Sequence, residues 1–240
     1  MAIHDSSLVR REVVAEGTMA FHFSKPAGFR HEAGQSLLMK LVNPPETDSE
    51  GDARTFTIAS APHEAELMIA TRMRDTAFKR VLKSAPAGTG VKINGPAGLM
   101  VLHDDAARPA VFLAGGIGIT PFLAMARHAV HVRLPHRLVL FYSNRRPEDA
   151  AFLPELQQME RLNPNYRLIA TMTEAETSAQ PWSGERGHIR RELLERHLAE
   201  VTGPIYYLAG PPAMTGAMRQ MLEEIGIGED AMQCEEFFGY

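Results

Sequence analysis

A glycine turn at residues 114–122, AGGIGITPF, has residue types and spacing that could bind a nucleotide. Its glycines, which allow tight backbone conformations and close approach, are Gly115, Gly116 and Gly118. We expect Thr120 and Pro121 to be the N-cap and the first residue of the helix that follows. A helix N-terminus behind a bare glycine turn suits a pyrophosphate. The alternative is a tight strand-to-helix turn without a ligand, because the spacing is not that of the usual dinucleotide fingerprint.

Two other strand ends in the same half of the sequence carry polar or small residues. The apolar run RLVLFY is followed by SNRR, and the run PIYYLA is followed by GPPAM at residues 210–214. An acidic residue after the second strand commonly binds the ribose of NAD, whereas an arginine can bind the 2′-phosphate of NADP. Arg145 or Arg146 is therefore a candidate for NADPH binding. RRPED could equally be a solvated helix start.

The stretch RTFTIAS at residues 54–60 is the third candidate. It predicts a short strand with Arg54, Phe56 and Ile58 on one face. A barrel wall rarely needs an arginine in such a row. Either an anionic ligand lies beside Arg54, or the side chain reaches solvent at the end of the strand.

The elements that carry these candidates predict two domains. Residues 1–105 contain short apolar runs separated by glycine and proline, which indicates an antiparallel β-barrel with one short helix in TAFKRVLKSA. In residues 106–240, compact apolar runs alternate with helical patterns, which predicts a doubly wound, five-stranded parallel sheet. Ligands bind at the carboxyl ends of such strands. The helices are expected over residues 121–131, 147–162, 190–199 and 213–226.

Composition argues against several classes of protein. A net charge of −4 does not suit a general nucleic-acid binder. No run of about 20 apolar residues predicts a membrane span, and the first residues lack a secretory h-region, so we expect a cytoplasmic protein. A single cysteine, Cys234, cannot form an internal disulfide or hold an iron–sulfur cluster by four thiolates. No carboxylate or cysteine near His128 and His131 completes a metal site, so we expect none.

In this order and spacing, RTFT, GGIGITP and AGPPAM resemble the motifs of the ferredoxin–NADP⁺ reductase superfamily. These flavoenzymes have a β-barrel flavin domain followed by a pyridine-nucleotide domain, and the resemblance runs from LVRREVV to the terminal EEFFGY. It implies FAD as cofactor and NAD(P)H as co-substrate, with NADPH favoured by the arginines. The implied activity is hydride transfer from NAD(P)H to flavin N5. Electrons then pass to a separate ferredoxin, flavodoxin or oxygenase component, because no iron–sulfur domain is fused here.

The resemblance also assigns roles to individual residues. Arg54 matches the residue that pairs with the flavin diphosphate, Phe56 the aromatic against the ring system, and Thr57 the hydrogen-bonding residue near N5. The flavin edge and diphosphate are matched by Ala70, Thr71, Arg72, Thr76, Ala77, Phe78 and Lys79. The nucleotide is matched by Gly115, Gly116, Gly118, Thr120, Pro121, Ser143, Asn144, Arg145, Arg146, Gly210, Pro211, Pro212 and Met214. At the tail, Glu236 and one of Phe237, Phe238 and Tyr240 approach the flavin, so the catalytic candidates are Thr57, Glu236 and Tyr240.

Ala209 is the main departure from the family pattern, because a cysteine that touches the nicotinamide usually stands there. Two alternatives therefore stay open: a flavin reductase that uses free flavin as substrate, and a non-catalytic subunit that binds nucleotide. The stretch TRMRDTAFKRVLK has an excess of cations that either docks an acidic acceptor protein or is a solvated helix face. Its docking candidates are Arg72, Arg74, Arg80 and Lys83.

Overall fold

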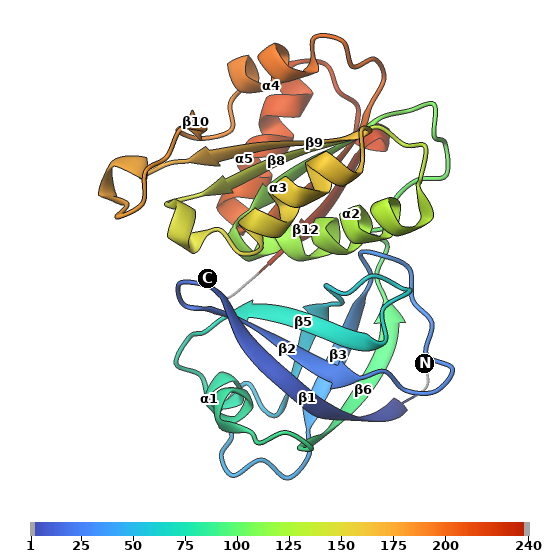
Figure 1. The fold of residues 1–240 in the computed structure, drawn as a ribbon, viewed down its shortest axis with the longest axis vertical. Coiled ribbons are helices and arrows are strands. Elements are labelled where there is room, and N and C mark those ends of the chain that lie inside the picture. The colour runs from blue at the N-terminus through green and yellow to red at the C-terminus, as the bar shows by residue number, and fades with distance from the viewer. Residues whose placement is uncertain (1–2, 238–240) are drawn as a thin grey trace.

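A computed structural model describes residues 3–237 and contains two six-stranded sheets (Figure 1). The first sheet is antiparallel, with strand order β4-β3-β6-β1-β2-β5. In β3, buried Leu37, Met39 and Leu41 alternate with exposed Leu38 and Lys40, so the period of two directs one face to a core. Its strands are β1 (Ile3–Ala15), β2 (Thr18–Ser24), β3 (Ser36–Leu41), β4 (Ala53–Thr57), β5 (Glu66–Arg72) and β6 (Gly90–Ala97).

The chain that leaves β4 closes this sheet into the predicted barrel. Ile58 N still donates to the carbonyl of Gln35, at 2.8 Å, but Ala59 N donates to the carbonyl of Met68 in β5, at 2.7 Å. The crossing from one edge strand to the other therefore follows directly after Thr57, the last residue of β4. The predicted short helix is α1 (Ala77–Ser84), and it buries Phe78 in the barrel core.

The second sheet is parallel, as predicted, with strand order β10-β9-β8-β7-β11-β12. It has one strand more than the sequence indicated, because Glu185 and Arg186 pair with the end of β9. Two residues are too few for a recognisable strand pattern. The strands are β7 (Ala110–Gly115), β8 (Leu138–Asn144), β9 (Tyr166–Met172), β10 (Glu185–Arg186), β11 (Ile205–Gly210) and β12 (Met232–Glu236).

Helices cover both faces of the parallel sheet (Figure 1). On the barrel side lie α2 (Thr120–Val132) and α3 (Leu153–Leu162), and on the other side α4 (Arg191–Leu198) and α5 (Pro212–Glu224). The helix expected over residues 147–162 is divided. A 3₁₀ turn, Pro147–Asp149, comes first, and α3 starts only after Phe152, whose φ is 61°. Pro154 explains the division, because proline is tolerated in the first turn of a helix and not in its interior.

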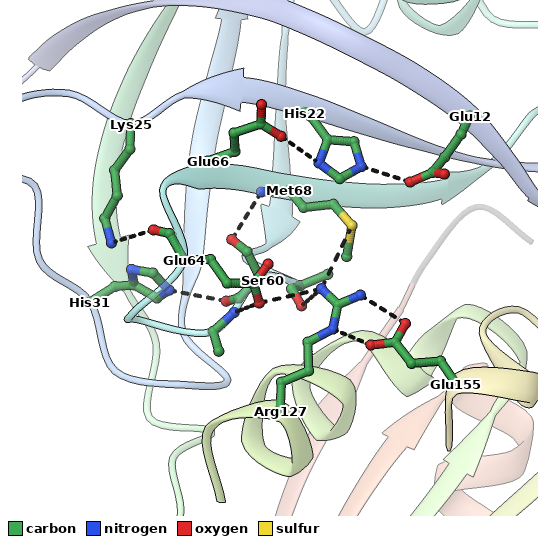
Figure 2. Close-up of polar contacts among 12 residues, drawn as sticks. Glu12, His22, Lys25, His31, Ser60, Glu64, Glu66, Met68, Arg127 and Glu155 are labelled. Carbon is green, nitrogen blue, oxygen red and sulfur yellow. Dashed lines mark hydrogen bonds and ion pairs between the residues drawn. The ribbon is translucent and has the colours of Figure 1, made fainter. Parts of the chain in front are cut away.

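Arg127 of α2 joins the α/β layer to the barrel (Figure 2). Its guanidinium donates to the carboxylate of Glu155 in α3 at 2.6 and 2.8 Å, and lies 3.4 Å from the carboxylate of Glu64 in the barrel. It also reaches Ala59 O, at 3.5 Å, next to the end of β4. Within residues 3–237 the structure contains no helix that is long and apolar enough to cross a membrane.

Candidate functional site

A groove of about 410 Å³ opens where the barrel meets the parallel sheet. Its wall brings together eight of the residues predicted for the flavin site: Arg54, Phe56, Thr57, Ala70, Thr71, Arg72, Thr76 and Lys79. From the α/β layer, Ile117 of the β7–α2 turn and Phe237 after β12 complete the lining. One groove thus joins the RTFT strand, the first glycine turn and the C-terminal tail.

The end of β4 presents an aromatic ring and an unpaired hydroxyl to the groove. Phe56 is half-buried, and its ring centroid lies 5.8 Å from that of Phe78 in the barrel core. Thr57 is only 4% exposed, and its Oγ1 has no hydrogen-bond partner among residues 3–237. Leaving a buried hydroxyl unpaired costs about 1–3 kcal/mol. A ligand in the groove that accepts or donates a hydrogen bond would remove this cost.

Arg54 is surrounded by acceptors of its own chain. Nη1 donates to the carbonyls of Glu50 and Ala53, both at 2.8 Å. Nη2 lies 2.8 Å from the Glu50 carboxylate and 3.3 Å from that of Asp48. Asp48 also accepts a hydrogen bond from Ala77 N, in the first turn of α1, at 2.9 Å. This bond and the nearby guanidinium hold the pKa of Asp48 below its ordinary value.

The start of α1 forms one end of the groove. Thr76 is the N-cap, and its hydroxyl accepts from Lys79 N at 3.3 Å. Burial, with Arg74 and Arg54 nearby, lowers the pKa of Lys79. Ala77 and Phe78 were also predicted to bind the cofactor, but their side chains are 1% exposed and lie in the barrel core. At these two positions only the backbone N–H groups can meet a ligand, because both side chains are buried in the core.

The two predicted glycine turns are in contact with each other. A Cβ on Gly118 would clash with the carbonyl of Ala209 and lie 2.6 Å from Gly210 N, and one on Gly115 would meet Met214. Glycine is therefore required here so that the β7–α2 turn can pack against the end of β11. The packing also brings Pro211 beside Gly115. Of the remaining predicted residues, Gly116, Pro212 and Met214 are partly exposed and Gly210 is buried.

The prediction that Thr120 is the N-cap is wrong. A 3₁₀ turn, Gly116–Ile119, runs directly into α2, so Thr120 has helical φ and ψ of −57° and −45°. Its hydroxyl donates to the carbonyl of Ile117 at 3.1 Å. Thr120 and Pro121 are both buried, so their side chains lie outside the groove. The sequence could not show this, because a 3₁₀ turn and a capped helix start favour the same residue types.

A second, smaller cavity of about 310 Å³ lies beyond Arg72, which lines both spaces. Arg145 and Arg146 line it too. Arg146 is engaged, with Asp149 at 2.9 Å and Glu16 of the β1–β2 turn at 3.0 Å. The Arg145 side chain is 72% exposed, and its Nε lies 3.8 Å from a Glu174 oxygen. Arg145 is thus the more accessible of the two.

Ser143 and Asn144 end β8, near this cavity but outside its lining. Ser143 is half-buried and Asn144 is 6% exposed. Both side-chain amide atoms of Asn144 lack a hydrogen-bond partner within the described part of the chain. The strand end therefore holds one more polar group that a ligand or a water molecule could satisfy.

At the tail, the structure separates two neighbouring glutamates. Glu236 is exposed, whereas Glu235 is half-buried, and burial raises the pKa of its carboxyl. Glu235 pairs with Ala209 in register, so its side chain lies on the same face of the sheet, the face that packs against α2. Glu236, the residue predicted from the sequence, lies on the opposite face of β12 from Glu235. A shift of one residue in a strand reverses the face, and only the pairing with β11 decides it.

Phe237 is the tail aromatic that the structure places in the groove. Its N–H donates to Gly210 O at 2.9 Å, which holds the ring beside the second glycine turn. Phe238 and Tyr240, the other predicted aromatics, lie outside the described residues.

Comparison with known proteins places this site in context. The family model of the oxidoreductase NAD-binding domain matches residues 112–220. The chain is 26% identical to ferredoxin–NADP reductase B of Sorangium cellulosum over 228 residues, and this alignment covers 91% of the chain and 90% of that protein. It is 28% identical over 225 residues to the glycine betaine monooxygenase reductase subunit of Chromohalobacter salexigens, covering 92% of this chain.

Over most of its length the chain is therefore similar to reductases of the ferredoxin–NADP⁺ reductase type. Its fold matches that of a ferredoxin–NADP⁺ reductase from Neisseria gonorrhoeae solved with FAD and NADP, with a TM-score of 0.82 at 19% identity over 99% of this chain and all of that one. The chain spans about 60% of the length of the Chromohalobacter relative. The groove between the barrel and the parallel sheet is lined by residues predicted for the flavin and by Ile117 of the first glycine turn.

Proposed function

We propose that the chain is an FAD-dependent NAD(P)H oxidoreductase that takes a hydride from NAD(P)H and passes electrons to a separate acceptor. The observation that carries this proposal is the groove, where Arg54, Phe56 and Thr57 of β4 share one lining with Ile117 and Phe237 of the α/β layer. The relatives named as reductase components of oxygenase systems support it. When bound, a flavin accepts a hydride and gives up one or two electrons at a time.

The residues present fit a flavin. The unpaired Oγ1 of Thr57 is suited to hydrogen-bond the polar edge of the ring system. The half-buried ring of Phe56 offers a packing face. Arg54, Lys79 and the N-terminus of α1 are suited to the diphosphate, because cations and helix N-termini both bind phosphate groups.

The chain's own residues must then bring the nicotinamide to the groove. Phe237 lines the groove beside the glycine turn, so it has to move aside before a nicotinamide reaches the ring. Ala209 is fully buried against the first glycine turn, and Glu235 is its partner in the neighbouring strand. We assign to Glu235, in place of Glu236, the role of orienting polar groups there.

For the nucleotide, we propose that Arg145 binds the 2′-phosphate of NADPH. Arg146 already has two carboxylate partners, whereas Arg145 is exposed and only weakly paired with Glu174. The adenosine end would then lie along the cavity that Arg72 shares with the groove. We also propose a domain boundary at residues 105–106, which falls in the segment between β6 and β7.

The acceptor protein and its docking surface belong to the same proposal. Of the four candidate residues, Arg80 is paired with Glu46 and Asp75, both at 2.6 Å, so its charge is balanced. Arg72, Arg74 and Lys83 are therefore the better candidates for an acidic partner. A cytoplasmic location is also proposed, and cell fractionation tests it.

The visible spectrum of the purified protein tests the central proposal. After reconstitution with FAD and gel filtration, we expect flavin absorbance in the protein peak, with FAD identified by mass. Adding NADPH should bleach it, and ferricyanide should restore it with turnover. A colourless protein would refute the flavin site. A yellow protein that NADPH does not bleach would favour the non-catalytic subunit instead.

A flavin reductase that uses free flavin is the second candidate, because the carboxylates of Asp48 and Glu50 occupy Arg54. Weak retention of flavin on gel filtration, with fast turnover when free flavin is added, distinguishes it from an enzyme with a resident cofactor.

A further inference from the structure

The β3–β4 loop places its own carboxylates on the groups suited to the flavin diphosphate. Asp48 bridges Ala77 N and Arg54, at 2.9 and 3.3 Å, and the Glu50 carboxylate lies 2.8 Å from Arg54 Nη2. Glu50 also lines the groove. An anion-binding end of the groove is thus filled by two carboxylates from one loop.

A diphosphate and these carboxylates cannot share this place. Two carboxylates beside a diphosphate would put like charges within a few ångströms, which is strongly unfavourable away from bulk water. Nη1 of Arg54 already donates to the carbonyls of Glu50 and Ala53, and Nη2 faces the two carboxylates, so a phosphate would have to replace these partners to bind both Nη atoms. The loop and the phosphate groups are therefore alternative occupants of Arg54 and of the α1 N-terminus.

Asp48 and Glu50 can turn away without unfolding the barrel, while Glu46 of the same loop keeps its ion pair with Arg80 of α1. At its base, Leu41 N donates to Asp52 O at 2.9 Å, and Lys40 lies 3.6 Å from the Asp52 carboxylate. These contacts hold the ends of β3 and β4 and do not involve Asp48 or Glu50. The Glu50 side chain is 67% exposed, so little packing is lost when it turns to solvent.

We propose that Asp48 and Glu50 determine flavin affinity and specificity by standing in for the diphosphate, and that FAD must displace them to bind. The inference rests on the proposed function and deepens it. Because only phosphate-bearing flavins compete with the carboxylates, the loop weakens FAD binding and leaves riboflavin binding unchanged. The flavin is then exchangeable, as a substrate-like flavin must be.

Flavin dissociation constants measured by fluorescence or calorimetry test this without any turnover. The variant Asp48→Asn/Glu50→Gln keeps the shape of the loop and removes both charges. Ion pairs that water still partly reaches contribute little each, so we expect FAD to bind about three- to tenfold more tightly and riboflavin equally well. Glu50→Gln alone, which leaves the hydrogen bond from Ala77 N to Asp48 intact, should give a smaller change in the same direction. Asp52→Asn is the matched control, because it removes one charge at the loop base as Glu50→Gln removes one within the loop. It should leave the dissociation constants of FAD and riboflavin unchanged.

The outcomes separate this inference from the function on which it rests. Unchanged or weaker FAD binding by both variants overturns it. Equal tightening of FAD and riboflavin also overturns it, because the loop would then act by bulk and not by charge. If wild type and variants bind neither flavin, the proposed function fails, and the inference falls with it. If flavins bind but the loop has no effect, only the inference fails.

Discussion

The ion pair of Arg127 should be a main source of stability where the α/β layer meets the barrel. Replacing Arg127 with Met keeps much of the apolar stem and removes the guanidinium. The Arg127 side chain is 18% exposed, and its donors reach Glu155 at 2.6 and 2.8 Å (Figure 2). Breaking a buried pair by removing one partner costs about 3–5 kcal/mol. The Glu155 side chain is 36% exposed, so water can solvate it after the substitution. We therefore expect Arg127→Met to lower the free energy of unfolding by about 2 kcal/mol.

Double-mutant cycles divide this loss between the two partners of Arg127. The bidentate contact with Glu155 should give a coupling free energy of about 1–2 kcal/mol, measured with Glu155→Gln. The contact with Glu64 is longer, at 3.4 Å, and should give about 0.5 kcal/mol with Glu64→Gln. Urea unfolding followed by circular dichroism measures each free energy. The reasoning would be refuted if the free energy of unfolding of Arg127→Met lay within 0.5 kcal/mol of the wild-type value. A larger coupling free energy to Glu64 than to Glu155 would also refute it.

Three further predictions concern the nucleotide preference, the glycine turn and pH. Arg145→Ala should lower the NADPH-to-NADH ratio of kcat/KM about tenfold, since one charge-assisted hydrogen bond is lost, and an unchanged ratio would remove Arg145 from this role. Gly118→Ala should lower the free energy of unfolding in urea by about 2–3 kcal/mol, because the added Cβ meets the Ala209 backbone. Gly216→Ala, in the open middle of α5, should raise it by about 0.5–1 kcal/mol. Equal effects of the two substitutions would contradict this. Burial and neighbouring His131 lower the pKa of His63, and its ring stacks on that of His131 with centroids 3.6 Å apart. The unfolded chain therefore binds more protons, and stability should fall as the pH drops below the ordinary histidine value of about 6.5, with a smaller fall in His63→Gln.

The sequence predicted the architecture well because both halves bury continuous or alternating apolar runs. The β7 pattern AVFL, between a proline and a glycine turn, has few alternatives to a buried parallel strand. The interruption at Pro154 was missed because a proline at the start of a helix and one inside a helical pattern look alike until packing decides between them. The short β10 was missed because it is defined by its neighbour, β9, and not by its own residues.

Local residues determine the placement of some predicted site residues, and neighbouring strands and loops determine that of others. Phe56 and Thr57, which lie on opposite faces of a regular strand, both line the groove because β4 ends at Thr57. The choice between Glu235 and Glu236 depended on the register with β11, which one sequence does not reveal. Arg54 was predicted to bind an anionic ligand, and in the structure it is paired with Asp48 and Glu50, from a loop that the sequence indicated only as exposed and acidic.

In the proposed binding mode, the ring end of the groove at Thr57 and the phosphate end at Arg54 differ in what a flavin gains on binding. At the ring end, Thr57 Oγ1 is unpaired in the described structure, so a hydrogen bond made there replaces nothing. At the phosphate end, each contact to Arg54 replaces one that Asp48 or Glu50 already makes. Net affinity should thus come mainly from the ring end, even though a diphosphate makes the stronger bonds in isolation. A flavin held chiefly by its ring is retained weakly for its size, and this is the property that separates a substrate flavin from a resident one.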